Sequence, residues 1–129
     1  MKQIYETLAR LASLPYQQNF ILNASKDEYE LPEQLIDEVI QSLSTVLNNT
    51  FETVQVSKVK QIESIKLLHS NLQILSENIN FDDIELSNEQ LVLHNKHWRE
   101  ARNKAFEFLK EIEFDIRTWE TDNIKSEKI

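Results

Sequence analysis

The chain contains no glycine among its 129 residues, although average usage of about 7% would give roughly nine. Tight β-hairpins favour glycine, and phosphate-binding loops need it where the backbone approaches the ligand. The absence argues against a dinucleotide fold, a P-loop, a nucleophile elbow and an EF-hand. Helices must end on other residues, and asparagine tolerates the left-handed C-cap best after glycine. We expect helices to end near Asn23, Asn48, Asn49, Asn78 and Asn80.

Cysteine is also absent, which excludes disulfides, thiolate metal ligands and thiol nucleophiles. Long apolar runs are missing as well. Glu6 and Arg10 interrupt the N-terminal stretch, unlike a secretory signal, and no run approaches the roughly 20 residues that a bilayer span needs. These absences predict a cytoplasmic protein with no membrane segment.

What the chain does contain is the composition of an ordinary globular protein, with 40% hydrophobic and 28% charged residues. We expect one helical domain over residues 1–122 and a frayed polar tail over 123–129. Apolar residues recur at helical spacing. The expected helices cover residues 2–13, a short segment opened by Pro15, residues 32–48, roughly 50–79, and about 30 residues from Ser87.

Two stretches fit this pattern less well. The polar segment 23–31 is expected to be irregular, although Ser25 and Glu28 could form a capping box. Residues 53–56 are β-prone by composition, which leaves the start of the fourth helix open.

The last expected helix carries the most regular apolar pattern in the chain. Residues recurring every seven positions are Leu91, Trp98, Ala105, Ile112 and Trp119, and the companion positions hold His94, Ala101 and Phe108. Ser87 and Gln90 form a capping box at its start. The fold class that we predict is therefore all-α, an antiparallel bundle of four to five helices with a long C-terminal helix.

No constellation of residues predicts catalysis or a cofactor. His94 and His97 lie three apart on a helix, but Gln90, one turn before, is not a usual zinc ligand. We expect His94 to be partly buried and His97 exposed. The pair Arg102-Asn103 resembles the arginine–polar pair of the helical nucleases called HEPN domains. That motif closes with a histidine, and this chain has Glu107 there, so ribonuclease activity is not expected.

The negative charge is concentrated in two short segments, which hold half of the 22 acidic residues and no lysine or arginine. They are Asp27, Glu28, Glu30, Glu33, Asp37 and Glu38 in the first, and Glu77, Asp82, Asp83, Glu85 and Glu89 in the second. Each segment opens a helix, where acids favour the macrodipole. If the helices run antiparallel, both segments share one end of the bundle and could steer a basic partner.

This distribution predicts a protein-binding module whose contact residues are these acids, Glu77 excepted, and which binds no nucleic acid directly. The specific hypothesis is a bacterial immunity protein or antitoxin-like inhibitor that covers the basic cleft of a nuclease toxin. One alternative is an oligomeric or adaptor subunit, such as a homodimer, with Trp119 and Phe114 at its interface. Another is a metal protein that uses His94 and His97.

The chain also has a basic run, which consists of Lys96, Arg99, Arg102 and Lys104. It could hold a phosphate or an acidic helix. Because Glu100 and Glu107 are interleaved with it, we expect a salt-bridged, solvated helix face instead.

Overall fold

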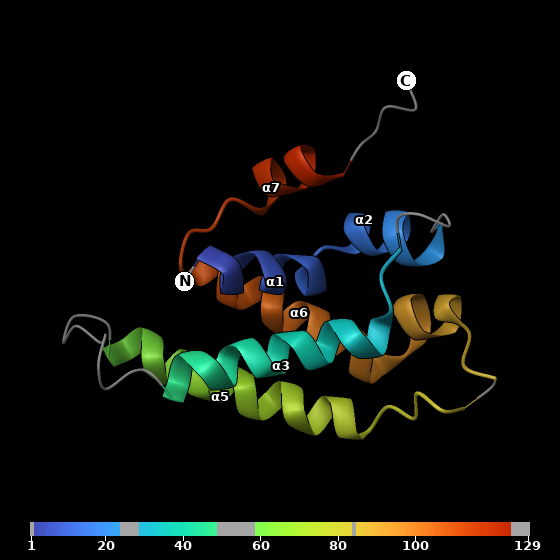
Figure 1. Ribbon diagram of the computed structural model, residues 1–129, viewed down its shortest axis with the longest axis horizontal. Coiled ribbons are helices and arrows are strands. Elements are labelled where there is room, and N and C mark those ends of the chain that lie inside the picture. Colours follow the sequence, from blue (N-terminus) through green and yellow to red (C-terminus); the bar gives the residue numbers. More distant parts are fainter. Residues whose placement is uncertain (1, 24–28, 49–58, 84, 125–129) are drawn as a thin grey trace.

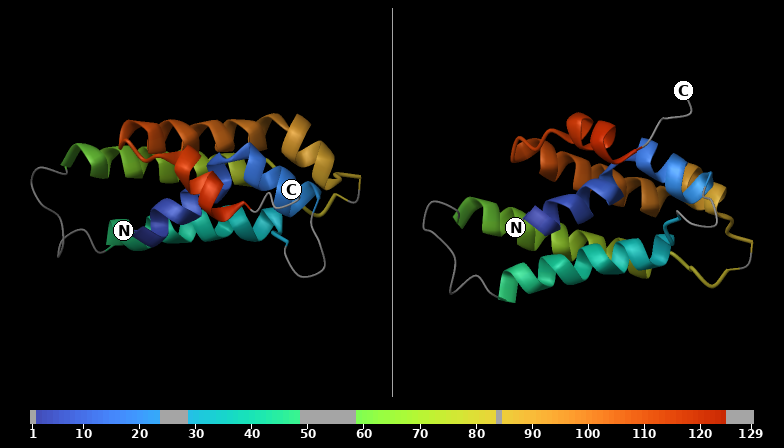
Figure 2. Two further views of the ribbon diagram at one scale, coloured as in Figure 1. Left: turned by 90° about the horizontal axis from the view of Figure 1, so that it is seen from above. Right: turned by 45° about the horizontal axis from the view of Figure 1, so that its top comes forward.

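The computed structural model describes residues 2–23, 29–48, 59–83 and 85–124, and these residues form an all-α bundle without a strand. Its four longer helices are α1 (Lys2–Ala12), α3 (Pro32–Asn48), α5 (Val59–Glu77) and α6 (Lys96–Glu111). α1 packs on α3 and α6, and α5 packs on the same two helices. Neighbouring helices run in opposite directions (Figures 1 and 2). The predicted fold class is therefore confirmed.

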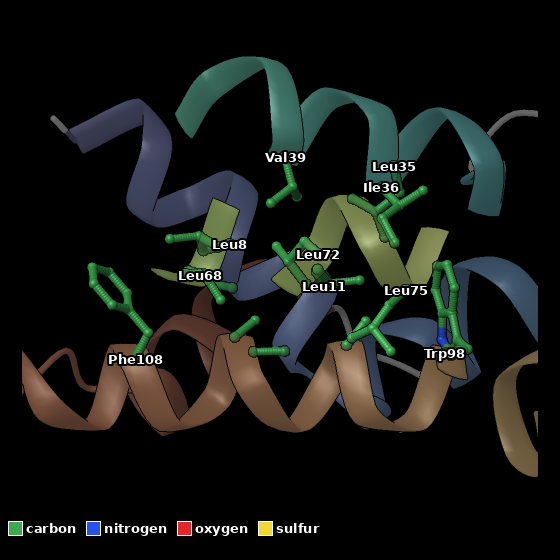
Figure 3. Close-up of a cluster of buried hydrophobic side chains, with 14 of the residues drawn as sticks. Leu8, Leu11, Leu35, Ile36, Val39, Leu68, Leu72, Leu75, Trp98 and Phe108 are labelled. Carbon is green, nitrogen blue, oxygen red and sulfur yellow. The ribbon is translucent and has the colours of Figure 1, made fainter. Parts of the chain in front are cut away.

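The core lies between these four helices, and it is filled by the apolar stripe of each. Figure 3 shows Leu8 and Leu11 of α1 facing Leu72 of α5, with Trp98 and Phe108 of α6 at opposite ends of the cluster. Leu8, Leu11, Leu72 and Trp98 are fully buried. Six members of the seven-residue pattern are buried, whereas Ile112 is half-buried and His94 is exposed. The buried members are Leu91, Trp98, Ala101, Ala105, Phe108 and Trp119.

Short elements follow α1 at its C-terminal end. α2 (Leu14–Gln17) begins after Ser13, whose Oγ accepts a hydrogen bond from the Tyr16 backbone N–H at 3.0 Å. Pro15 lies in its first turn, as expected, where a missing N–H costs nothing. η1 (Gln18–Leu22), a π-helical turn, continues from it. The Ser25–Glu28 capping box, the start of the fourth predicted helix, the β-prone residues 53–56 and the tail beyond 124 lie outside the described residues.

The continuous helix predicted from Ser87 is wrong, because the structure breaks it at Asn95 and again after Glu111. Its beginning is confirmed in part, since Ser87 Oγ accepts from the Gln90 N–H at 3.1 Å. The chain then forms a π-helical turn, η3 (Gln90–His94). Asn95 is extended, and its Oδ1 accepts from the His97 and Trp98 N–H groups at 3.0 Å each. This side chain starts α6 as a new helix.

The break at Asn95 changes which histidine faces the protein. His94 is exposed and His97 is half-buried, the reverse of the expectation. A regular helix advances by 100° per residue, whereas the π-helical turn and the extended Asn95 displace that register. Trp98 nevertheless returns to the core.

The second break ends α6 in a left-handed residue, and that residue is a glutamate. Glu113 has φ 62°, the one positive φ among the described residues. The Phe114 N–H donates to Leu109 O at 2.9 Å and the Glu113 N–H to Lys110 O at 3.0 Å, the hydrogen bonds of a Schellman motif. η1, α3 and α5 end at or next to Asn23, Asn48 and Asn78, as predicted, but none of these three asparagines is left-handed. Asn23, which ends η1, has φ −111°, and Asn78 instead donates its Nδ2 to Ile74 O.

We expect Glu113→Gly to raise the free energy of unfolding by about 1 kcal/mol, because a residue with a Cβ pays about 1–2 kcal/mol in the left-handed region. Urea denaturation followed by circular dichroism measures the change. The matched control is Glu111→Gly in the last turn of α6, where glycine should instead destabilise by about 1 kcal/mol. Destabilisation by both substitutions would contradict the conformation assigned to Glu113.

The last element, α7 (Ile116–Asn123), lies on the outside of the bundle (Figure 1). Asp115 caps the start of α7, and its carboxylate accepts a hydrogen bond from the Thr118 N–H at 3.1 Å. The hydrogen bonds from Thr118 lower the pKa of Asp115. Trp119 is buried against Tyr16, with ring centroids 5.5 Å apart. Phe114 is half-buried near Tyr5. These aromatic rings pack α7 on the bundle. Trp119 is therefore buried and Phe114 half-buried, and neither is an exposed aromatic residue of the kind that the oligomer alternative assumed.

Candidate functional site

The antiparallel arrangement brings the start of α3 and the loop between α5 and η3 to the same end of the bundle, at the right of Figure 1. An open groove lies between them. It is lined from the α3 side by Leu31, Pro32, Glu33 and Gln34, and from the loop side by Phe81, Leu86, Asn88 and Leu91. The two acidic segments of the sequence thus flank a common depression.

Five of the eight residues that line this groove are apolar. Pro32 and Leu91 are buried beneath it, and Phe81 and Leu86 are half-buried in its wall. Leu31 remains 46% exposed at its edge, although it is a large apolar side chain. A partner that covered the groove would remove this apolar surface from water.

The rim of the groove is negatively charged, and its acids form no ion pair with the residues that the structure describes. Glu33 is part of the lining, and Asp82, Asp83, Glu85 and Glu89 are all exposed beside it. Within residues 2–23, 29–48, 59–83 and 85–124, the ion pairs join Arg10 to Glu30 and Arg10 to Glu38. None of the five rim carboxylates takes part in them.

Two of these rim acids have an explanation in the helices themselves. Glu33 lies in the first turn of α3 and Glu89 in the first turn after Ser87, where negative charge stabilises the macrodipole. Asp82, Asp83 and Glu85 precede the capping residue Ser87 and belong to no helix. The Asp83 carboxylate accepts from the Glu85 N–H at 2.9 Å, which fixes the turn. These three loop acids are the strongest candidates for partner contacts.

The structure gives other acids of the first segment a different role. Glu30, whose side chain is 12% exposed, accepts from Arg10 at 2.9 Å and from the Tyr16 hydroxyl at 2.7 Å. Burial and this hydrogen bond raise the pKa of Tyr16 well above its ordinary value. Burial lowers the pKa of Arg10, but Glu30 and Glu38 outweigh it and the net shift is upward. Glu30 and Glu38 are thus occupied in joining α1 to the chain around α3.

Three candidates of the first acidic segment remain. Asp37 is exposed on α3, but it does not line the depression. Asp27 and Glu28 lie outside the described residues. The described residues contain no group of three or more histidine, aspartate or glutamate side chains that could hold a metal ion.

Sequence reasoning missed a buried polar cluster centred on Gln17, which is fully buried. Its Nε2 donates to Arg10 O at 3.1 Å and to Leu11 O at 2.6 Å. Its Oε1 accepts from Trp98 Nε1 at 3.1 Å and from Arg102 at 3.4 Å. One glutamine therefore ties the end of α1 to α6. Nothing in the sequence around Gln17 distinguishes it from its exposed neighbour Gln18.

This cluster also gives Arg102 a structural role. Besides Gln17, Arg102 donates to Val92 O at 2.9 Å and so links α6 to η3. Burial lowers the pKa of Arg102, and the neighbouring Arg99 lowers it further. Of the pair Arg102-Asn103, which resembles the nuclease motif, the arginine therefore stabilises the fold, whereas Asn103 is exposed.

The rest of the basic run lies on the outer face of α6. Lys96, Arg99 and Lys104 surround a shallow depression that Glu100, Asn103 and Glu107 also line. In the part of the chain that the structure describes, neither glutamate forms an ion pair with these cations. The prediction of salt bridges on this face is therefore wrong, whereas the prediction that the face is solvated is right.

Comparisons with protein-family models, with curated protein sequences and with solved structures found no match to this chain. Its residues and geometry are therefore the basis for any functional assignment. Of the helices in the described ranges, none combines the length and the apolar character that crossing a membrane requires.

Proposed function

We propose that this protein is an acidic protein-binding module, and specifically an immunity-type inhibitor of a basic toxin. The observation that carries the proposal is the position of Asp82, Asp83 and Glu85. They lie together beside the groove and are exposed, and among the described residues none of the three forms an ion pair or belongs to a helix. Exposed carboxylates next to an apolar surface are typical of a site that binds a cationic partner.

The physical reason for choosing a nuclease-type toxin is its charge. A protein that cleaves nucleic acid must present a positive cleft to the phosphate backbone. A small protein of net charge −8 can occupy that cleft in place of the phosphates, and electrostatic steering makes its association fast. The proposed partner is thus a basic protein, and nucleic acid itself is not bound. No catalytic residue or cofactor is part of this function.

The direct test is affinity capture on the immobilised protein, with elution by rising salt and mass spectrometry of the eluate. A basic nuclease that is retained at low salt, and whose activity falls when this protein is added, supports the proposal. Recovery of no basic partner removes its support.

Reversing Asp82, Asp83 and Glu85 to lysine should slow association with the captured partner by about 10- to 1,000-fold at low salt, because steering depends on these charges. Helical content should not change, since all three are exposed. Surface plasmon resonance at several salt concentrations measures both rate constants.

The matched control reverses Glu63, Glu100 and Glu107, which are exposed on α5 and α6 away from the groove. It changes the net charge by the same amount. If the two triple variants slow association equally, only the net charge matters and the groove is not the contact site.

A second candidate function is self-association through α5, which one observation favours. Leu67 is 63% exposed and Ile74 is 56% exposed on this helix. They are seven positions apart and thus lie on one face. Sedimentation of the protein alone tests this candidate: a dimer that Leu67→Ser dissociates would support an oligomeric subunit, and a monomer at all concentrations would reject it.

A further inference from the structure

The groove has a regular pattern of apolar and acidic neighbours. Pro32 and Glu33 are adjacent in the sequence, as are Phe81 and Asp82, and Glu85 and Leu86. In each pair, the apolar residue lines the groove. Because the pairs come from both sides of the groove, a ligand seated on the apolar surface meets carboxylates on more than one side.

The charges narrow the class of ligand. Phosphate backbones and anionic lipid surfaces are repelled by uncompensated carboxylates. A purely apolar ligand would place those carboxylates at the edge of a dry contact without neutralising them, which is costly. A ligand with one apolar group between cations can contact the apolar lining residues and neutralise the neighbouring carboxylates at the same time. Protein interfaces commonly use this arrangement, with an anchor side chain in a pocket and polar contacts around it.

We propose that the groove between Leu31 and Leu86 binds a basic protein segment by one large apolar side chain. Lysine or arginine residues on either side of that side chain contact Glu33 on the α3 side and Asp82, Asp83 and Glu85 on the loop side. The inference rests on the proposed function and adds the mode of binding. Burial of the apolar side chain slows dissociation of the complex, whereas the acidic residues speed its association.

The test uses short fluorescent peptides as probes, each with a single tryptophan flanked by two lysines on either side. Fluorescence anisotropy with the full chain measures their dissociation constants. Replacing the probe's tryptophan by serine should weaken binding by about tenfold to a hundredfold, the value of burying one large apolar side chain. Replacing its lysines by glutamates should abolish binding. Equal affinity for the tryptophan and serine probes would overturn the anchor.

Variants of the protein locate the binding. Leu31→Ser and Leu86→Ser should each weaken the tryptophan probe at least several-fold and leave the serine probe unchanged. Leu67→Ser is the matched control, because Leu67 is an exposed leucine on α5 outside the groove. Leu31 is already 46% exposed, so its replacement leaves the fold intact, and circular dichroism checks this. If all three variants behave alike, the groove is not the site.

The same variants separate this inference from the proposed function. If a basic partner is captured and the acid reversals slow its association, but Leu31→Ser and Leu86→Ser leave its dissociation rate unchanged, the function stands and the anchor is wrong. If the tryptophan probe binds in the groove but no basic partner is captured and inhibited, the groove stands and the inhibitor function is wrong. Binding of a second copy through its α6 cations would appear as concentration-dependent self-association and would also reject the anchor.

Discussion

Replacing Trp98 with alanine is expected to lower the free energy of unfolding by about 3 to 5 kcal/mol, the usual cost of removing a large buried aromatic side chain. Trp98 is fully buried at one end of the core (Figure 3). Its Nε1–H donates to Gln17 Oε1, so the substitution leaves a cavity and also removes a cross-link between α6 and α2. Urea denaturation followed by circular dichroism gives the loss.

Two further variants separate these contributions. Trp98→Phe keeps most of the ring and removes the donor, so it should cost about 1 to 2 kcal/mol. Phe106→Ala removes an aromatic ring from the same helix, but Phe106 is 42% exposed, and the loss should stay below about 1 kcal/mol. A Trp98→Ala loss as small as that of Phe106→Ala would show that Trp98 does not fill the core.

Replacing Gln17 with leucine should destabilise the protein by about 3 kcal/mol or more, although leucine is apolar and close in size. The substitution removes one amide that meets two carbonyls, an indole N–H and a guanidinium. Each buried polar group left without a partner costs about 1–3 kcal/mol. The effect therefore runs against the usual rule that apolar residues stabilise a core.

The matched control is Gln18→Leu, since Gln18 is the next residue in the chain and is exposed. Its effect should lie within about 0.5 kcal/mol of zero. A double-mutant cycle of Gln17→Leu and Trp98→Phe should show a coupling of about 1 kcal/mol, because both changes break the same hydrogen bond. Strict additivity of the two losses would contradict that bond.

Much of the helical architecture could be predicted from the sequence. Pro15 and Pro32 each lie in the first turn of an observed helix, and Ser87 caps the start of another. The seven-residue pattern identified Trp98 and Phe108 as core residues. These features could be predicted because capping and helical periodicity depend on residues within a few positions of each other.

The two breaks in the predicted last helix were harder to predict from the sequence. Asn95 caps α6 with its own side chain, a local interaction, but the apolar pattern continues through it without interruption. Glu113 adopts a left-handed conformation that a sequence reader would assign to glycine or asparagine. In a chain without glycine, the hydrogen bonds of the Schellman motif and the packing of Phe114 and Leu109 fix this backbone instead.

The sequence by itself determined that the chain is helical, where most of its helices begin, and that its negative charge lies in two segments. Only the tertiary structure decided what those charges do. It paired Glu30 and Glu38 with Arg10, left Asp82 and Asp83 exposed beside the groove, and buried Gln17. The reason is physical: burial and ion pairing depend on which distant residues meet, and helical periodicity carries no information about that.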